Sequence, residues 1–193
     1  MPPYLAPIEK PRGLLLKLTY YFTRRMFGKV STPIAVFSAR MPTAFLSFYG
    51  KVSRLDNKLT LPQQAVVLIR ERVASINGCL YCMDASRRYA LSKTPGVLPK
   101  LDALAEYQTS PLFTDTERAA LDYVSELVRH QSVSPGTFAE LSRHYSEREI
   151  CDIVWLVASE HVYNMTNIGL GIGSDGMCEL RTRSQSTVTA APS

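Results

Sequence analysis

Helix start signals recur along this chain and constrain its fold more than any other feature. The segments 114–117 (Thr-Asp-Thr-Glu) and 146–149 (Ser-Glu-Arg-Glu) have the spacing of capping boxes, in which the first and last side chains satisfy free N–H groups of a new helix. Pro33 and Pro135 stand where a first helical turn would begin. Apolar residues at helical spacing follow these signals, and no segment alternates convincingly between apolar and polar residues. The sequence therefore predicts one all-α domain.

Helical segments are expected from residue 13 to residue 167. Their ranges are 13–27, 34–40, 43–53, 79–92, 98–107, 119–128, 135–145 and 150–167, together with a helix that residues 59–62 open and whose apolar side spans 65–76. The segment 65–76 is so rich in apolar residues that it should be buried on more than one side. We divide the chain into a basic N-terminal arm with a helix (1–31), a helical domain (32–180) and a polar tail expected to be disordered (181–193).

The net charge of +5 is confined to the start of the chain. Residues 1–31 hold six basic side chains and one acidic side chain, whereas residues 32–193 hold 16 of each. The helical domain lacks the basic excess typical of nucleic-acid binding, so we expect no nucleic-acid partner. A basic, aromatic arm could contact a membrane surface or RNA, but such a segment more often packs on its own domain or on a partner subunit.

The expected location is the cytoplasm. No stretch approaches about 18 consecutive apolar residues, so no membrane span is expected. The first residues lack the basic-then-apolar order of a secretory signal. In a reducing compartment a close pair of cysteines is more often catalytic or metal-binding than structural.

Such a pair is present at Cys79 and Cys82, directly after Asn77-Gly78. Two thiols three residues apart lie on one face of a helix, close enough to form a disulfide. The Asn-Gly pair interrupts the backbone, so the motif should open a new helix, where free N–H groups and the helix dipole favour the thiolate. A redox dithiol is the first hypothesis, and two unreactive buried cysteines are the alternative.

Other uses of the motif fit less well. A zinc site needs four ligands, and the remaining cysteines and histidines are scattered singly at Cys151, Cys178, His130, His144 and His161. Covalent haem attachment needs a His directly after the second cysteine, where this chain has Met83. A thioredoxin-type fold needs strands around the motif, and none is expected. We therefore predict neither a metal nor a cofactor.

The motif Asn77-Gly78-Cys79-x-Tyr81-Cys82, which follows a helix containing Arg-Val-Ala, resembles the carboxymuconolactone decarboxylase/AhpD-like (alkylhydroperoxidase) family. The resemblance extends over most of residues 30–178, and the specific motif lies within about residues 67–89. The decarboxylase branch typically lacks the cysteine pair, so the pair indicates the AhpD-like branch. The resemblance implies an all-helical, cytoplasmic homo-oligomer that reduces peroxides or exchanges disulfides with a partner protein.

The same resemblance implies that Cys82 attacks the peroxide and that Cys79 resolves it as an intramolecular disulfide. A helix-terminus argument alone would favour Cys79 as the more acidic thiol. In the family, a His four residues after the second cysteine and a Glu twelve residues before the first cysteine form a proton relay that activates the thiol. This chain departs from that pattern at both positions, where it has Ser86 and Val67 respectively. Neither of these side chains replaces the usual proton relay, so the group that activates the cysteines is left open.

Glu71, Glu160 and His161 are the candidates to replace that relay. Glu71 lies one turn after the position of the missing Glu and on the same helix face, although a surface position between two arginines fits it equally well. Glu160 shares one stripe of an apolar helix with Asn164 and Asn167, and His161 is adjacent. Polar groups on a buried helix must find partners, so they line a site or a subunit contact, or they form structural hydrogen bonds.

Asp84, Tyr81 and the two remaining cysteines have simpler interpretations. Asp84 would oppose thiolate formation unless it is paired. Tyr81 should pack rather than react, and Cys151 and Cys178 are expected to be ordinary buried thiols.

The sequence thus predicts a thiol-dependent antioxidant protein, a peroxidase or disulfide oxidoreductase, in which Cys79 and Cys82 cycle between dithiol and disulfide. The alternative is a family member without peroxidase chemistry that serves as an oligomeric binding or scaffold protein. The missing His and Glu favour that alternative. The residues indicate no particular peroxide, disulfide or reducing partner.

Overall fold

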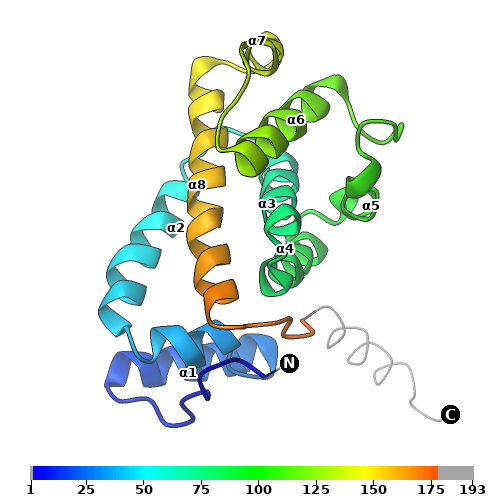
Figure 1. The fold of residues 1–193 in the computed structure, drawn as a ribbon. Coiled ribbons are helices and arrows are strands. Elements are labelled where there is room, and N and C mark those ends of the chain that lie inside the picture. Colours follow the sequence, from blue (N-terminus) through cyan, green and yellow to red (C-terminus); the bar gives the residue numbers. More distant parts are fainter. Residues whose placement is uncertain (1, 178–193) are drawn as a thin grey trace, which may run out of the picture.

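Helix α3 (Gln63–Asn77) runs through the centre of the computed structural model, which describes residues 2–177 (Figure 1). It packs against α4 (Leu80–Lys93), α6 (Asp115–His130) and α8 (Glu147–Gly169). No strand occurs among the described residues, so the predicted all-α fold is confirmed.

Helix α3 is buried on two sides, as its crowded apolar pattern predicts. One side joins Val66, Ile69 and Val73 to a core formed with α6, α7 (Pro135–His144) and α8. The other side joins Val67 and Leu68 to a second core that includes residues of α4 and α5 (Leu98–Asp102). A helix held on both sides is a rigid base for residues at its ends.

The caps explain where the later helices begin. Thr114 accepts a hydrogen bond from the Glu117 N–H and forms a complete capping box at α6, and Ser146 does the same with Glu149 at α8. Ser134 caps α7 in front of Pro135. Both predicted capping boxes are confirmed, and α8 begins three residues earlier than expected because its box defines its first turn.

Two stretches near the N-terminal end of the domain differ from the expected regular helices. Residues Ile34–Ser38 (η1) and Ala44–Tyr49 (η2) form wider π-helical turns, and α2 (Gly50–Asp56) continues the second one. The N–H of Ala39 bonds to the carbonyl of Ile34, five residues back. Periodicity does not separate these turns from α-helix, because both present one face to the core.

The helix expected at 98–107 is divided as well. Short 3₁₀ turns, η3 (Pro95–Val97) and η4 (Leu104–Glu106), stand on either side of α5. Leu101 and Leu104 are both buried, and a 3₁₀ turn places residues three apart on one face.

The N-terminal arm contacts the first turn of the helical domain, at η1, and the segment that follows its last helix, α8. Helix α1 (Leu14–Phe27) lies across the end of the molecule where α8 finishes (Figure 1). The Tyr4 N–H donates to the Leu170 carbonyl at 3.0 Å, and Ile8 N–H donates to the Ala35 carbonyl at 2.9 Å. Asp175 accepts from the Thr32 N–H at 2.9 Å and from Lys29 Nζ at 3.1 Å.

Helix α1 also has an outward apolar face. Its exposed members are Leu14, Leu15, Leu18, Tyr21 and Phe22.

No helix within residues 2–177 combines the length and apolar character needed to cross a membrane. The expected tail and Cys178 lie outside the described residues.

Candidate functional site

The turn between α3 and α4 places the two cysteines. Gly78 ends α3 in the left-handed conformation with a φ of 72°, which glycine adopts without the steric cost that a Cβ brings. Helix α4 therefore begins at once, with Cys79 as its N-cap and Cys82 in its first turn. The prediction that the Cys-x-x-Cys motif opens a helix is confirmed.

The two sulfur atoms are joined in a disulfide and accept hydrogen bonds from two donors. The Cys82 N–H donates to Cys79 Sγ at 3.3 Å, so the sulfur itself caps α4. Asn167 of α8 directs its amide Nδ2 at Cys82 Sγ, 3.4 Å away, and lies 3.9 Å from Cys79 Sγ. Donors of this kind stabilise a thiolate once the pair is reduced.

The two cysteines differ in access. Cys82 lines a cavity of about 510 Å³, whereas Cys79 is 1% exposed and does not line it. The cavity is enclosed by η1, η2, α2, α3, α4 and α8. A small molecule in it would meet Cys82 first.

The walls of the cavity are mainly apolar and include several aromatic rings. Tyr49 stands between Phe37 and Tyr163, with ring centroids 6.1 and 5.1 Å away respectively. Tyr81 and Tyr89 also line the cavity. The Tyr81 hydroxyl is 2.6 Å from Ser31 Oγ, and burial raises the pKa of Tyr81 to about 12, so this phenol stays neutral near physiological pH.

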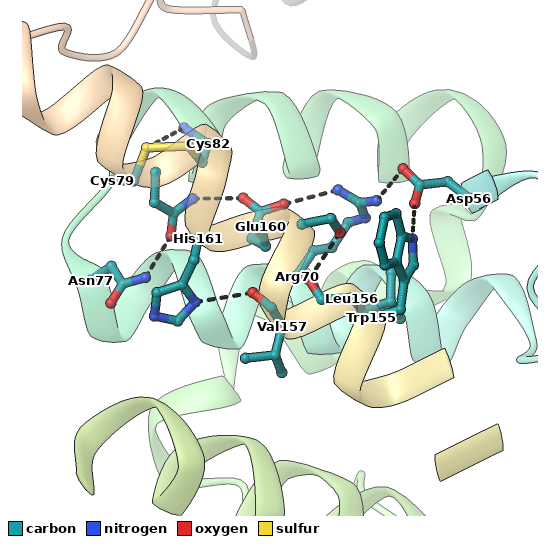
Figure 2. Close-up of polar contacts among 12 residues, drawn as sticks. Asp56, Arg70, Asn77, Cys79, Cys82, Trp155, Leu156, Val157, Glu160 and His161 are labelled. Atoms are coloured by element: carbon teal, nitrogen blue, oxygen red, sulfur yellow. Dashed lines mark hydrogen bonds and ion pairs between the residues drawn. A yellow bond between two sulfur atoms is a disulfide. The ribbon is translucent and has the colours of Figure 1, made fainter. Parts of the chain in front are cut away.

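A row of polar side chains runs from the cysteine end of the cavity along α3 and α8 (Figure 2). Arg70 donates to Glu160 Oε2 at 2.9 Å and to Asp56 Oδ2 at 2.6 Å. Asn164 donates to Glu160 Oε1 at 2.7 Å and accepts from Asn77 Nδ2 at 2.9 Å. The single guanidinium thus stands between two carboxylates.

Glu160 is nine-tenths buried or more, and its burial raises the pKa of the carboxyl above its ordinary value. Arg70 and Asn164 oppose that shift. The predicted stripe of Glu160, Asn164 and Asn167 divides by position: Glu160 and Asn167 line the cavity, whereas Asn164 is fully buried behind it.

Glu71 is buried, so the alternative interpretation of Glu71 as a surface residue between two arginines was wrong. It is 1% exposed, and Arg87 Nε lies 3.4 Å from its Oε1. Burial, only partly offset by Arg87 and Ser86, raises the pKa of Glu71 to about 7. Glu71 does not itself line the cavity, but Ser86 does.

His161 is oriented away from the cavity. Its Nδ1 is 3.0 Å from the Val157 carbonyl, and it is not among the cavity-lining residues (Figure 2). Asp84 is paired: it accepts from Ser174 Oγ at 2.9 Å and from the Met177 N–H at 2.8 Å. Cys151 is an exposed free thiol, which corrects the expectation that it is buried.

Arg70 and Asp56 were absent from the residues predicted for the site. A signal was available for Arg70, because it is a charged residue on a helix expected to be buried on more than one side. Asp56 gave none, since its role depends on one ion pair between the end of α2 and Arg70 of α3, 14 positions later in the chain. Across residues 2–177, no group of three or more His, Cys, Asp and Glu side chains is placed to hold a metal ion.

The helical arrangement is that of the AhpD-like, peroxidase-related proteins. A solved structure described as an alkylhydroperoxidase AhpD core, an uncharacterised peroxidase-related protein from Ralstonia eutropha JMP134, superposes with a TM-score of 0.74 at 20% identity, covering 92% of this chain and 95% of that one. A protein of unknown function from Agrobacterium tumefaciens, suggested to be the antioxidant defence protein AhpD, gives a TM-score of 0.66 at 21% identity over 72% of this chain and 94% of its own.

The same fold occurs in the debrominase Bmp8. Its cysteine-to-alanine variant in complex with 2,3,4-tribromopyrrole matches with a TM-score of 0.75 at 20% identity, over 96% of this chain and 98% of that one. Among curated proteins, the uncharacterised protein YnjA of Escherichia coli strain K12 is 28% identical over 179 residues, 91% of this chain and 96% of YnjA. No family model matches the sequence.

Proposed function

We propose that this protein is a thiol-dependent reductase in which Cys82 attacks a small-molecule substrate and Cys79 then forms the disulfide with it. The observation that carries the proposal is the unequal access of the two thiols: Cys82 borders the cavity, with the Asn167 amide on its sulfur, and Cys79 lies behind it. This arrangement supports the assignment of Cys82 as the attacking thiol over the helix-terminus argument for Cys79.

With a peroxide as substrate, the reaction balances within the pair. The Cys82 thiolate forms a bond to one peroxide oxygen, the O–O bond breaks, and the leaving oxygen takes a proton to become an alcohol or water. Cys79 then attacks the oxidised Cys82 sulfur and releases water as the disulfide forms. Two thiols are oxidised and one peroxide is reduced, and an external dithiol must reduce the disulfide again.

The cavity favours an uncharged organic substrate. Its volume of about 510 Å³ is within the range of small-molecule sites and far exceeds what hydrogen peroxide needs. Among the described residues that line the cavity, Arg70 is the only cation, and Asp56 and Glu160 already pair with it. An organic hydroperoxide or an uncharged disulfide fits these walls better than a carboxylate does.

The proposal is tested by treating the reduced protein with about one equivalent of an organic hydroperoxide. We expect a mass loss of two hydrogens and no alkylatable thiol in the peptide that contains Cys79 and Cys82. Cys82→Ser should abolish peroxide consumption, whereas Cys151→Ser, at an exposed cysteine outside the cavity, should leave it unchanged. If both thiols persist, or if Cys82→Ser still consumes peroxide at the parent rate, the scaffold interpretation replaces this one.

A second candidate function is reductive dehalogenation, favoured by the aromatic rings of Phe37, Tyr49 and Tyr163 around the cavity and by the fold shared with Bmp8. In that reaction a carbon–bromine bond becomes a carbon–hydrogen bond, bromide leaves, and the two thiols supply two electrons as they form the disulfide. One proton is released.

Bromide release from 2,3,4-tribromopyrrole by the reduced protein checks this second candidate. We expect one bromide per disulfide formed and none from Cys82→Ser. Disulfide formation with hydroperoxide but no bromide release would restrict the protein to the first function.

A further inference from the structure

Two buried polar atoms, one on α3 and one on α4, have no partner at ordinary hydrogen-bond distance and angle. They are Glu71 Oε2 and Ser86 Oγ, and among the described side chains only Thr94 Oγ1 shares this condition. Buried polar groups are nearly always hydrogen-bonded, so each exception in a folded protein calls for a reason. Two such atoms on adjoining helices, one of them a single turn after Cys82, indicate a function rather than a packing defect.

Ser86 is a neighbour of both Cys82 and Glu71. It follows Cys82 by one turn of α4, where residues four apart are neighbours on one face, and both residues line the cavity. Glu71 approaches from α3, behind the wall, and the Ser86 hydroxyl is close enough to lower its pKa. Ser86 is thus adjacent to Cys82 along α4 and to Glu71 across the contact between α3 and α4; of the three residues, Cys82 and Ser86 line the cavity and Glu71 does not.

The charged groups that face Glu71 come from two helices. Arg87 of α4 contacts Oε1 and is itself held by Asp102 of α5 at 2.6 Å, while the charge of Glu160 on α8 raises the pKa of Glu71. Arg87 engages only one carboxylate oxygen, which leaves Oε2 available to the Ser86 hydroxyl. With a pKa of about 7, Glu71 accepts and returns a proton at neutral pH.

We propose that Ser86 and Glu71 are the proton path of Cys82. This inference rests on the proposed function of the cysteine pair. Ser86 Oγ accepts the thiol proton, directly or through one water, and passes its own proton to Glu71 Oε2, so that the Cys82 thiolate forms beside the cavity. After the thiolate attacks, the path runs in reverse and delivers the proton to the leaving oxygen. Ser86 alone does not replace the missing relay, because a hydroxyl is too weak a base; it contacts the thiol and passes the proton on, and Glu71 is the base that acts through it.

The test measures the reactivity of Cys82 rather than peroxide turnover. In a Cys79→Ser background, the tryptic peptide 73–87 contains Cys82 as its one thiol, and its alkylation by iodoacetamide is followed from pH 5 to pH 9. The parent profile should show an inflection near pH 7, the pKa of Glu71. Glu71→Gln and Ser86→Ala should each remove that inflection and slow alkylation at pH 7 by about tenfold or more.

Two matched variants separate a proton path from a structural role. Ser86→Thr keeps the hydroxyl and should retain the parent profile. Ser92→Ala removes an exposed hydroxyl from the same helix and should change nothing. Unchanged profiles in Glu71→Gln or Ser86→Ala would overturn the proposal, as would a loss in Ser86→Thr equal to that in Ser86→Ala. Because alkylation needs no peroxide, failure of the proposed function would leave this result readable.

Discussion

Arg70→Ala should lower the free energy of unfolding by about 2–4 kcal/mol at pH 8, because it leaves a buried carboxylate without its ion partner. Arg70 now donates to Glu160 and to Asp56, and the Glu160 side chain is only 7% exposed. Urea denaturation of the variant and the parent protein at pH 8 and pH 5 provides the measurement.

The loss should be smaller at pH 5. The folded-state pKa of Glu160 is already above its ordinary value of 4.5, and removing Arg70 raises it further. A carboxyl whose pKa is higher in the folded than in the unfolded state contributes fully to the free energy of unfolding below its unfolded-state pKa. That contribution is lost as the pH rises through the folded-state pKa. At pH 5 the variant can protonate Glu160 and avoid most of the cost.

Arg143→Ala is the matched control. Its ion pair with Glu140 is exposed on α7, so its removal should change the free energy of unfolding by less than about 0.5 kcal/mol. Glu160→Gln in the Arg70→Ala background should recover part of the loss, since the two residues contact each other. Equal losses at pH 5 and pH 8 would mean that packing of the Arg70 chain, rather than charge, stabilises this contact.

Glu71→Gln should stabilise the protein at pH 8 by about 1–3 kcal/mol, even though it should slow the thiol chemistry. The pKa of Glu71 is raised from 4.5 to about 7, so ionising it in the folded protein is unfavourable. Its stability contribution is complete below about pH 4.5 and is lost as the pH rises to about 7. Gln does not ionise and avoids that loss, although it gives up the ion pair with Arg87.

Denaturation curves for Glu71→Gln at pH 5 and pH 8 check this expectation. The gain at pH 5 should stay under about 1 kcal/mol, because Glu71 is then mostly protonated in the folded state. Glu147→Gln, at an exposed position in the first turn of α8, serves as the control and should show no such rise with pH. A loss of stability at pH 8 would show that Glu71 is well accommodated as a carboxylate, which would also weaken its proposed role as a proton acceptor.

A gain in stability together with slower thiol chemistry is the pattern expected of a residue kept for its function. Buried ionisable groups that lower stability are found where a reaction needs them, and their removal commonly stabilises a protein while reducing its activity. The denaturation and alkylation experiments on Glu71→Gln therefore measure the effect of one residue on stability and on thiol reactivity, and the two effects are expected to have opposite signs.

The sequence by itself determined the helical fold and the place of the cysteine pair. Capping boxes at 114–117 and 146–149 are local signals, because each side chain bonds within its own first turn. Gly78 and Cys79 are equally local: the left-handed turn at Gly78 makes Cys79 the N-cap of the next helix. Such features depend on neighbours in the chain and need no tertiary contact.

Only the tertiary structure decided what surrounds the sulfur atoms. Asn167 follows Cys82 by 85 positions, and Glu160 follows Arg70 by 90, so no local pattern could pair them. The burial of Glu71 and the position of His161 outside the cavity depend on how α3, α4 and α8 pack. Neighbouring residues such as Glu160 and His161 have different surroundings because a helix turns by about 100° per residue. The placement of the cysteines at the start of a helix could be predicted from the sequence because it depends on neighbouring residues alone. Their environment required the fold, since it is assembled from helices far apart in the chain.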